Sequence, residues 1–407
     1  MRFEVSRVLD TIEQRLTTDA TLAQAAVDMA EVARFVELDG GRGINLLRIG
    51  MVIDALGRYL HDGGALLYPV AGRELLGDGE LTSKERMVLG RWADDGLIEV
   101  TPQVTDRVFE VAELAGLAVI ARRNPAEAAG RYPWLRDLPH RALTLRPLGG
   151  GALLTDASGG TGAVVLTPSG EVQPSPDGAG PDRGHPQRRN GWAPVRPPVP
   201  SGLGAALLAR TWRCEEFSCP AFGDERRIGQ PVPRMRSGVP MCPRHDQPLK
   251  DLGPRPPQVA LSVVIDGLGR RHFAIAPGRP VVIGRSPDDP PSDVHIGQWL
   301  EGAAKSWISR NHVRLELHER ALTVTDISTN GTTVLTRSGP DATPERIRLV
   351  RHEPRLLGEW DTVELYTGVE VCRSAPPLPD DAAPEVEPAS VLADAPTVAL
   401  RLPSFGS

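Results

Sequence analysis

Proline and glycine interrupt this sequence so densely that a single packed core cannot extend through it. The 407 residues include 42 glycines and 39 prolines, and no collagen-like repeat is present. Such an excess over average usage indicates linkers between compact pieces. The densest interruption, Pro174 to Pro200, contains eight prolines. We therefore expect a multidomain chain with segments at 1–121, 122–205, 206–253, 258–375 and 376–407.

The charge balance and the hydrophobic pattern narrow the class of protein. Lysine and arginine number 46 against 52 acidic residues, a formal net charge of −6. This disfavours nucleic-acid binding through bulk charge, although a local basic patch stays open. Apolar runs stay well short of the ~18 residues of a membrane span, and the N-terminus lacks the apolar region of a secretory signal. We expect a cytoplasmic protein without a membrane partner. Few of its basic residues are lysines, which is typical of high-GC, actinobacterial-like bacterial genomes.

Residues 1–121 show mainly helical periodicity. Apolar positions recur at helical spacing from Val5 to Leu16 and again over 22–36, and a further helix runs from Asn45 until Asp62-Gly63-Gly64 ends it. A capping-box pattern opens a later helix, a short strand follows at 97–100, and a last helix is expected over 104–115. This order predicts an α-helical, winged-helix-like domain.

Two functions suit such a domain. The helix after the capping box carries nearly equal numbers of acidic and basic residues, which disfavours contacts with DNA phosphates. A helical protein-interaction or dimerisation domain is the preferred interpretation, and a DNA-binding domain is the alternative.

Residues 122–205 are rich in proline, glycine and arginine. Ala142–Leu145 and Ala163–Leu166 are strand-like and predict a β-hairpin. The stretch 183–196 is locally basic, and we interpret it as a solvated linker, with weak nucleic-acid contact as the alternative.

Three cysteines and a histidine follow the linker in the pattern C-x4-C-x22-C-x2-H. Two close pairs joined by a loop suit a tetrahedral Zn²⁺ ion in a closed structural site. The intervening loop has few apolar residues, so a metal cross-link would supply folding energy. The alternative is a set of free, partly buried thiols. The predicted ligands of this zinc-ribbon-like module are Cys214, Cys219, Cys242 and His245.

From Val259 onward the pattern changes to short alternating strands separated by turn residues, which predicts an antiparallel β-sandwich. Three loop motifs lie between these strands: Gly284-Arg285, Ser309-Arg310-Asn311-His312, and Thr329-Asn330-Gly331. Loops at one end of a sandwich converge. An arginine fork, hydroxyl donors and an asparagine amide at one rim match the charge and oxygens of a phosphorylated side chain.

In this order, the motifs resemble those of the forkhead-associated (FHA) domain, a β-sandwich that binds phosphothreonine peptides. The resemblance covers roughly Val259 to Ser374, and it places Cys372 in the last strand. Extra residues over 298–307 and a long charged loop over 337–353 depart from compact members and shape the surface near the rim. By position, the resemblance implies phosphate contacts from Arg285, Ser309, Arg310 and Thr329, peptide-backbone binding by Asn330, and loop geometry held by Gly284, His312 and Gly331.

The C-terminal segment 376–407 is rich in proline, alanine and aspartate, which predicts a disordered tail. Thr397 is followed three positions later by Leu400, a spacing that resembles targets of FHA domains. One hypothesis is that phosphorylated Thr397 binds the sandwich of the same chain or of another; a plain tail is the alternative.

These features favour a non-enzymatic adaptor that binds a phosphothreonine-containing protein downstream of a Ser/Thr kinase. A DNA-binding regulator controlled by phosphorylation is the alternative. The sequence shows no nucleophile–base set, no P-loop and no open metal site, so we do not expect an enzyme.

Overall fold

The computed structural model describes residues 2–156, 202–223, 231–289, 293–339 and 342–374. Its first part, the α/β unit (residues 2–156), is built on one six-stranded sheet in the order β3-β2-β1-β4-β5-β6. The first five of these strands are parallel to one another, and β6 is antiparallel to β5. The strands are β1 (Ala25–Asp28), β2 (Leu67–Ala71), β3 (Glu99–Val100), β4 (Ala118–Ala121), β5 (Ala142–Leu148) and β6 (Gly151–Asp156).

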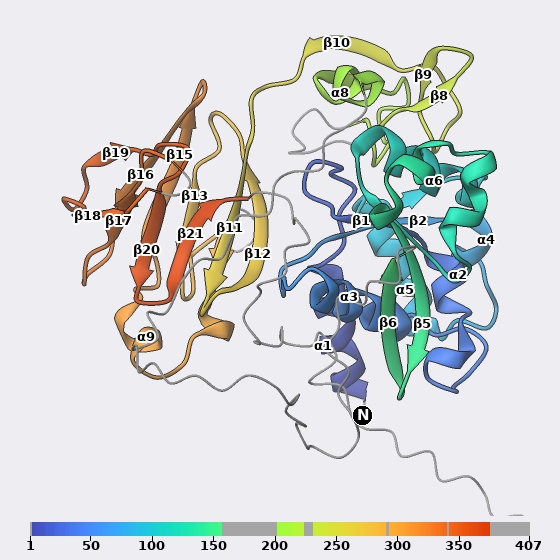
Figure 1. Ribbon diagram of the computed structural model, residues 1–407, viewed down its shortest axis with the longest axis horizontal. Helices are drawn as coiled ribbons and strands as arrows, with labels where there is room; N and C mark the ends of the chain where they lie inside the picture. Colours follow the sequence, from blue (N-terminus) through green and yellow to red (C-terminus); the bar gives the residue numbers. More distant parts are fainter. Residues whose placement is uncertain (1, 157–201, 224–230, 290–292, 340–341, 375–407) are drawn as a thin grey trace, which may run out of the picture.

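Helices cover both faces of this sheet (Figure 1). The predicted capping box is present, since the Thr82 hydroxyl and the Glu85 side chain bond each other's backbone N–H at the start of α5. The helices are α1 (Arg2–Glu13), α2 (Met29–Ala33), α3 (Leu47–Tyr59), α4 (Arg73–Leu76), α5 (Ser83–Asp94), α6 (Val104–Ala115) and α7 (Trp134–Asp137), with 3₁₀ turns at Val36–Leu38, Pro125–Gly130 and Pro139–Arg141.

The prediction of a helical, winged-helix-like domain over 1–121 is wrong in architecture. Most of its helices are found, but β1 and β2 were missed because both are short and almost wholly buried. A buried parallel strand is a short apolar run that periodicity cannot distinguish from part of a helix. The region is a parallel α/β sheet, and the winged-helix basis for DNA binding is therefore lost.

The sheet also extends beyond residue 121. β5 and β6 form the antiparallel hairpin that completes it, so this stretch belongs to the α/β unit and not to a linker. The hairpin begins at the predicted Ala142, but its second strand is Gly151–Asp156. The predicted strand Ala163–Leu166 and the proline-rich stretch lie outside the described residues.

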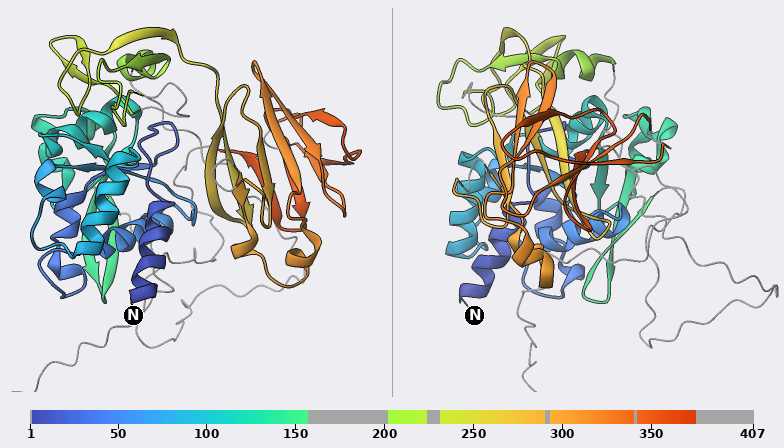
Figure 2. Two further views of the ribbon diagram at one scale, coloured as in Figure 1. Left: turned by 180° about the vertical axis from the view of Figure 1, so that it is seen from behind. Right: turned by 90° about the vertical axis from the view of Figure 1, so that its left-hand side faces the viewer.

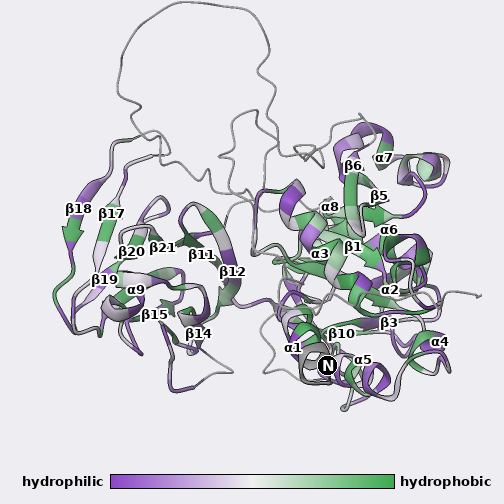
Figure 3. Cartoon of the chain, turned by 90° about the horizontal axis from the view of Figure 1, so that it is seen from below, coloured by the Kyte–Doolittle hydropathy of each residue, from purple (hydrophilic) through white to green (hydrophobic). Residues whose placement is uncertain are grey.

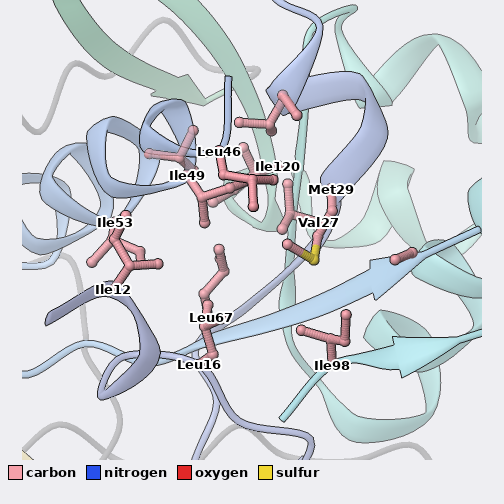
Figure 4. Packing of buried hydrophobic residues seen from close by; sticks show 14 of the residues in the cluster. Ile12, Leu16, Val27, Met29, Leu46, Ile49, Ile53, Leu67, Ile98 and Ile120 are labelled. Carbon is pink, nitrogen blue, oxygen red and sulfur yellow. The ribbon is translucent and has the colours of Figure 1, made fainter. Parts of the chain in front are cut away.

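Two hydrophobic cores form on the two faces of this sheet. One joins α1, α2, α3 and α5 to the sheet; Ile12, Ile49 and Leu67 belong to it, and Figure 4 shows their packing. The other lies under α6. It also includes buried residues of the following segment, among them Cys214 and Cys242. The second face of the sheet is therefore covered partly by this later segment.

That segment, the Cys–His module (described residues 202–223 and 231–254), lies over α6 (Figures 1 and 2). β7 pairs with β10, and β8 pairs with β9, both antiparallel. Its elements are α8 (Gly202–Leu208), β7 (Arg210–Arg213), β8 (Arg234–Arg236), β9 (Val239–Met241) and β10 (Lys250–Pro254).

The predicted antiparallel sandwich is present over residues 259–374. One sheet has the order β12-β11-β21-β20-β17-β18 and the other β14-β13-β15-β16-β19. All pairings are antiparallel except that of β13 with β14. The strands are β11 (Val259–Ile265), β12 (Leu268–Ile275), β13 (Val281–Gly284), β14 (Val294–His295), β15 (Val313–His318), β16 (Ala321–Asp326), β17 (Thr333–Thr336), β18 (Glu345–Arg348), β19 (Pro354–Leu356), β20 (Thr362–Tyr366) and β21 (Val369–Arg373).

Hydrophobic side chains between the two sheets form the third core. Figure 3 shows hydrophobic residues along the strands of both the sandwich and the α/β unit. A 3₁₀ turn (Gly297–Trp299) and a short helix, α9 (Gly302–Trp307), lie between β14 and β15. Among the described residues, no helix has the length and apolar character needed to cross a membrane.

Candidate functional site

The three predicted loop motifs meet at one end of the sandwich, beside α9. We call their predicted ligand-binding residues, Arg285, Ser309, Arg310, Thr329 and Asn330, the rim. The Ser309 Oγ lies 3.3 Å from the Thr329 Oγ1 and accepts a hydrogen bond from the Thr329 backbone N–H at 3.1 Å. The structure therefore brings together two hydroxyls that are distant in sequence.

Close backbone contact fixes the base of the rim. A Cβ on Gly284 would overlap the carbonyl oxygen of Arg310, so only glycine fits at this position. The next N–H, that of Arg285, donates to the Ser309 carbonyl at 3.0 Å. The loop before β15 is thereby held against the end of β13, with the side chains of Arg285 and Arg310 exposed to solvent.

His312 supports the rim from below. Its side chain is fully buried, and its Nδ1 accepts a hydrogen bond from the Ser309 N–H at 3.0 Å. Burial lowers the pKa of His312 to about 4, so the ring is neutral at neutral pH. A neutral ring can accept at Nδ1, whereas an imidazolium could not.

Asn330 is held from two sides. Its Nδ2 donates to the Trp307 carbonyl at 2.6 Å, and its own carbonyl accepts from Arg348 Nη2 at 2.8 Å. Gly331 follows with φ +90, a conformation that favours glycine, and a Cβ there would overlap the Arg348 guanidinium. These contacts fix the Asn330 amide at the edge of the rim.

The extra residues over 298–307 lie at the rim, as predicted. They fold into the 3₁₀ turn and α9, and the Lys305 carbonyl accepts from Arg285 Nη1 at 3.3 Å. The Trp307 ring, 40% exposed, lies 6.0 Å from the Tyr366 ring. This segment therefore forms one wall beside the phosphate-binding position expected from the sequence.

The predicted long loop over 337–353 is partly wrong. It contains β18, which pairs with β17 and carries Arg348 to the back of Asn330. Sequence reasoning missed Arg348 because the run around it reads only as charged surface. Its place beside the Asn330 carbonyl depends on a strand pairing that the local pattern does not reveal.

The rim carries positive charge that no neighbouring carboxylate neutralises. Across the described ranges, neither Arg285 nor Arg310 has an ion-pair partner, and the one side-chain contact of Arg285 is to the uncharged Lys305 carbonyl. Asp288, the acidic residue nearest in the chain, is held by the Asn311 side-chain amide at 2.7 Å. Two exposed guanidinium groups beside two hydroxyls form a site suited to a dianion with several acceptor oxygens.

Residues 281–365 match the family model described as the FHA domain. The predicted resemblance is therefore confirmed for this part of the chain, and the protein contains an FHA domain. No match was found among curated proteins.

Several solved FHA domains are similar to the sandwich. That of human APLF, in complex with an XRCC1 bisphospho peptide, is 20% identical with a TM-score of 0.20, over 28% of this chain and 97% of that one. The FHA domain of CT664 from Chlamydia trachomatis is 18% identical with a TM-score of 0.22, over 29% and 97%. The MEK1 FHA domain, solved with a phosphothreonine peptide of HOP1, is 18% identical with a TM-score of 0.20, over 28% and 95%.

The predicted metal ligands also converge. The ligand atoms of Cys214, Cys219, Cys242 and His245 all lie within 4.8 Å of one another, and the three cysteines are buried. The two sulfurs of Cys219 and Cys242 are 3.7 Å apart. His245 Nδ1 is 3.4 Å from the Cys214 sulfur and 3.6 Å from that of Cys242.

The three separations of 3.4, 3.6 and 3.7 Å are close to those of a tetrahedral site. With Zn–S near ~2.3 Å and Zn–N near ~2.0–2.1 Å, the ligand atoms of a tetrahedral site lie about 3.5–3.8 Å apart. The hydrogen bond between the Cys219 and Cys242 sulfurs lowers the pKa of Cys219 and raises that of Cys242, so this pair favours one thiolate. The Cys–His module can therefore hold a metal ion. The fourth cysteine, Cys372, lies in β21 as expected and is half-buried.

The module is tied to the α/β unit by buried polar contacts as well as by the shared core. Arg107 in α6 is 1% exposed and pairs with Glu99 and Glu110. The same guanidinium donates to the carbonyls of Val232 and Pro233 in the module. The metal-ligand cluster is thus part of the packing on one face of the sheet.

Proposed function

We propose that this protein is a non-enzymatic adaptor that binds phosphothreonine-containing peptides through its FHA domain. The observation that carries the proposal is the rim itself: two exposed, unneutralised guanidinium groups next to two hydroxyls that the fold brings together. A phosphothreonine carries about −1.5 to −2 charges and three acceptor oxygens, which such a rim can satisfy.

Each rim residue has a role that its position supports. Arg285 and Arg310 would offset the charge, and the hydroxyls of Ser309 and Thr329 would donate to phosphate oxygens. The oriented Asn330 amide would bind the peptide backbone beside the phosphate. Gly284, His312 and Gly331 would hold the loops, through close approach, the Ser309 contact and the positive φ described above.

The test is a phosphothreonine peptide-library screen on the full chain, repeated with the unphosphorylated library. We expect binding only of phosphorylated peptides, with a sequence preference set partly by the wall that α9 forms. Equal capture of the two libraries would refute the proposal.

The upstream enzyme would be a Ser/Thr kinase, since the ligand is a phosphothreonine. Thr397 lies outside the described residues, and we keep it as a candidate phosphoacceptor that would bind the rim in cis or in trans. Thr397→Ala should then change the affinity for added phosphopeptide after kinase treatment of the full chain. Unchanged phosphorylation and unchanged affinity would remove this hypothesis.

We further propose that the Cys–His cluster holds a structural Zn²⁺ ion. The ligand set and its distances support zinc, and four protein ligands close the coordination sphere. Metal analysis of the purified protein should give one zinc per chain. The three thiols should become titratable only after chelation, whereas substoichiometric zinc with freely reacting thiols would contradict the proposal.

A further inference from the structure

Where the sandwich meets the α/β unit, the contact is polar, buried and closely fitted. Strand β12 is the part of the sandwich nearest the α/β unit in Figures 1 and 3. Its His272 contacts Asp62, which follows α3. The His272 Nε2 donates to Asp62 Oδ2 at 2.6 Å, and the two residues are 4% and 1% exposed. A buried carboxylate needs such a partner.

His272 also forms a hydrogen bond within the sandwich. Its Nδ1 lies 2.6 Å from the Ser262 Oγ, which in turn lies 2.6 Å from the Ser374 Oγ. Ser262 is fully buried in β11, and Ser374 directly follows β21. The chain of hydrogen bonds therefore joins one residue of the α/β unit to three positions of the sandwich, with both ring nitrogens satisfied.

Neighbouring charges suit an ionised Asp62. Burial alone would raise the pKa of this carboxyl, but His272, Arg15 and the Gly64 N–H outweigh burial and hold the pKa below its usual value. The Arg15 side chain also donates to the Ala65 carbonyl, and Arg271 Nη1 donates to the Gln14 carbonyl at 2.8 Å. Four side chains, two from each unit, therefore lie at this contact: Asp62, Arg15, His272 and Arg271.

Two glycines show how close the surfaces are. A Cβ on Gly64 would lie 3.0 Å from the Arg271 nitrogen, and a Cβ on Gly269 would overlap a carboxylate oxygen of Asp62. Neither glycine has a positive φ, so the turn itself does not require glycine at either position. At both positions the facing unit occupies the space that a Cβ needs, and at Gly64 the Asp62 carboxylate of the same unit adds to this at 3.1 Å. We call Asp62, Gly64, Gly269 and His272 the seam.

The connection between the units is also restrained. Only residues 255–258 separate β10 from β11, and two of them are prolines, which stiffen a linker. The Arg255 N–H donates to the Ala209 carbonyl at 2.8 Å, and its guanidinium lies 3.7 Å from the buried Asp19 carboxylate. Figure 2 shows β10 leading from the Cys–His module to the sandwich. The sandwich is thus held at its connector as well as at the seam.

We propose that the seam is an intramolecular docking surface that seats the FHA domain on the α/β unit in one fixed orientation. The rim then has a defined place relative to the α/β unit. This inference concerns docking alone, and its test contains no phosphopeptide, so it stands or fails separately from the proposed function.

The test adds one methyl group to either side of the seam in the full chain: Gly64→Ala on the α/β unit and Gly269→Ala on the sandwich. We call each added methyl group a wedge, because it should push the two surfaces apart. Gly77→Ala is the matched control, because a Cβ there meets no atom within 4 Å. Two readouts are used: amide hydrogen exchange, and ¹⁵N relaxation, which gives the rotational correlation time of each unit.

In the parent protein and in Gly77→Ala, the two units should share one correlation time. Each wedge should increase exchange on both faces of the seam, at residues 62–65 and in β12, while the β15–β16 hairpin and β1 stay protected. The correlation time of the sandwich should fall. Asp62→Asn should produce the same pattern more weakly, because the amide keeps the size of the carboxylate but loses its charge.

Three results would overturn the proposal. The first is a sandwich that already tumbles independently in the parent protein. The second is a pair of wedge variants with unchanged exchange at the seam. The third is increased exchange throughout the sandwich in both wedge variants, since opening a docking surface should leave each unit folded.

Discussion

The rim and the Cys–His cluster are both sets of converging polar side chains, but they relate to the fold in opposite ways. The rim lies on loops at the end of a finished sandwich, and Arg285 and Arg310 face solvent. Cys214, Cys219 and Cys242 are at most 3% exposed and share a hydrophobic core with α6. A set of converging residues can therefore lie on the surface of an already stable fold, as the rim does, or can be part of the packing that stabilises the fold, as the cluster is. Substitutions should therefore separate the two: binding should fail at the rim, and folding should fail at the cluster.

The largest effect is expected from removing a metal ligand. Cys242→Ser should lower the melting temperature of the α/β unit as well as of the module, because structural zinc contributes folding energy and this cluster shares a hydrophobic core with α6. The loss should be several kcal/mol, a large part of a typical domain stability of about 5–15 kcal/mol. Thermal unfolding followed by circular dichroism measures it.

Cys372→Ser is the matched control, since this cysteine lies in β21, away from the cluster. Chelation of the parent protein should reproduce the effect of Cys242→Ser. A Cys242→Ser protein as stable as the control would show that the cluster is not part of the scaffold.

Arg285→Ala should leave the fold intact and weaken phosphopeptide binding on the order of 10–100-fold, because a hydrogen bond to a charged group is worth about 1.5–3 kcal/mol. Calorimetric titration against a phosphopeptide measures the change. The control is Arg314→Ala, which removes an exposed arginine of β15 that pairs with Glu316. If both variants bound equally well, the rim would not be the phosphate site.

The third effect depends on pH and sharpens the role of His312. Its pKa is about 4 in the folded protein against about 6.5 for an unperturbed histidine. As the pH decreases, His312 therefore binds a proton in the unfolded chain before it does so in the folded protein. Its contribution to the stability of the sandwich is fully present above about pH 6.5 and is lost as the pH decreases toward 4. Melting temperatures between pH 7 and 4.5 should fall more steeply for the parent than for His312→Gln. Parallel slopes would contradict this, and exposed His318→Gln is the control.

The smallest effect is expected at the support of the rim. Arg348→Ala removes the hydrogen bond that its guanidinium donates to the Asn330 carbonyl. A bond with a charged donor is worth about 1.5–3 kcal/mol, but this exposed contact supports the rim without touching the phosphate, so only part of that energy should appear in binding. We expect phosphopeptide affinity to fall by roughly 2–10-fold, measured in the same titration. Arg346→Ala, which removes the neighbouring arginine paired with Glu364, should leave the affinity unchanged. An equal loss in both variants would mean that only general positive charge matters.

The sequence predicted the sandwich and both clusters because order and spacing carry that information. Gly284-Arg285, Ser309 to His312 and Thr329 to Gly331 are local motifs, and the strands between them alternate. The C-x4-C-x22-C-x2-H spacing is local in the same sense. Each set can therefore be predicted from the sequence without knowing which distant strands pair with one another.

The features that were missed depend on long-range packing. β1 and β2 are buried parallel strands whose apolar runs have no period of two, so they were assigned to helices or to connections. Arg348 reaches Asn330 only because β18 pairs with β17. The His272–Asp62 contact joins residues that are 210 positions apart, and the Asp62-Gly63-Gly64 sequence reads simply as the end of a helix.

The central claim is that the rim holds the phosphate of a phosphothreonine, and ³¹P NMR observes that phosphate directly. A phosphothreonine peptide selected from the library is titrated with the full chain while its ³¹P resonance is followed from pH 5 to 8. The account predicts a shifted resonance and a phosphate pKa below its free value near ~6, since Arg285 and Arg310 favour the dianion. In the bound state of Arg285→Ala both changes should be smaller, because only Arg310 then favours the dianion. A bound peptide whose phosphate resonance and pKa remain those of the free peptide would contradict the account.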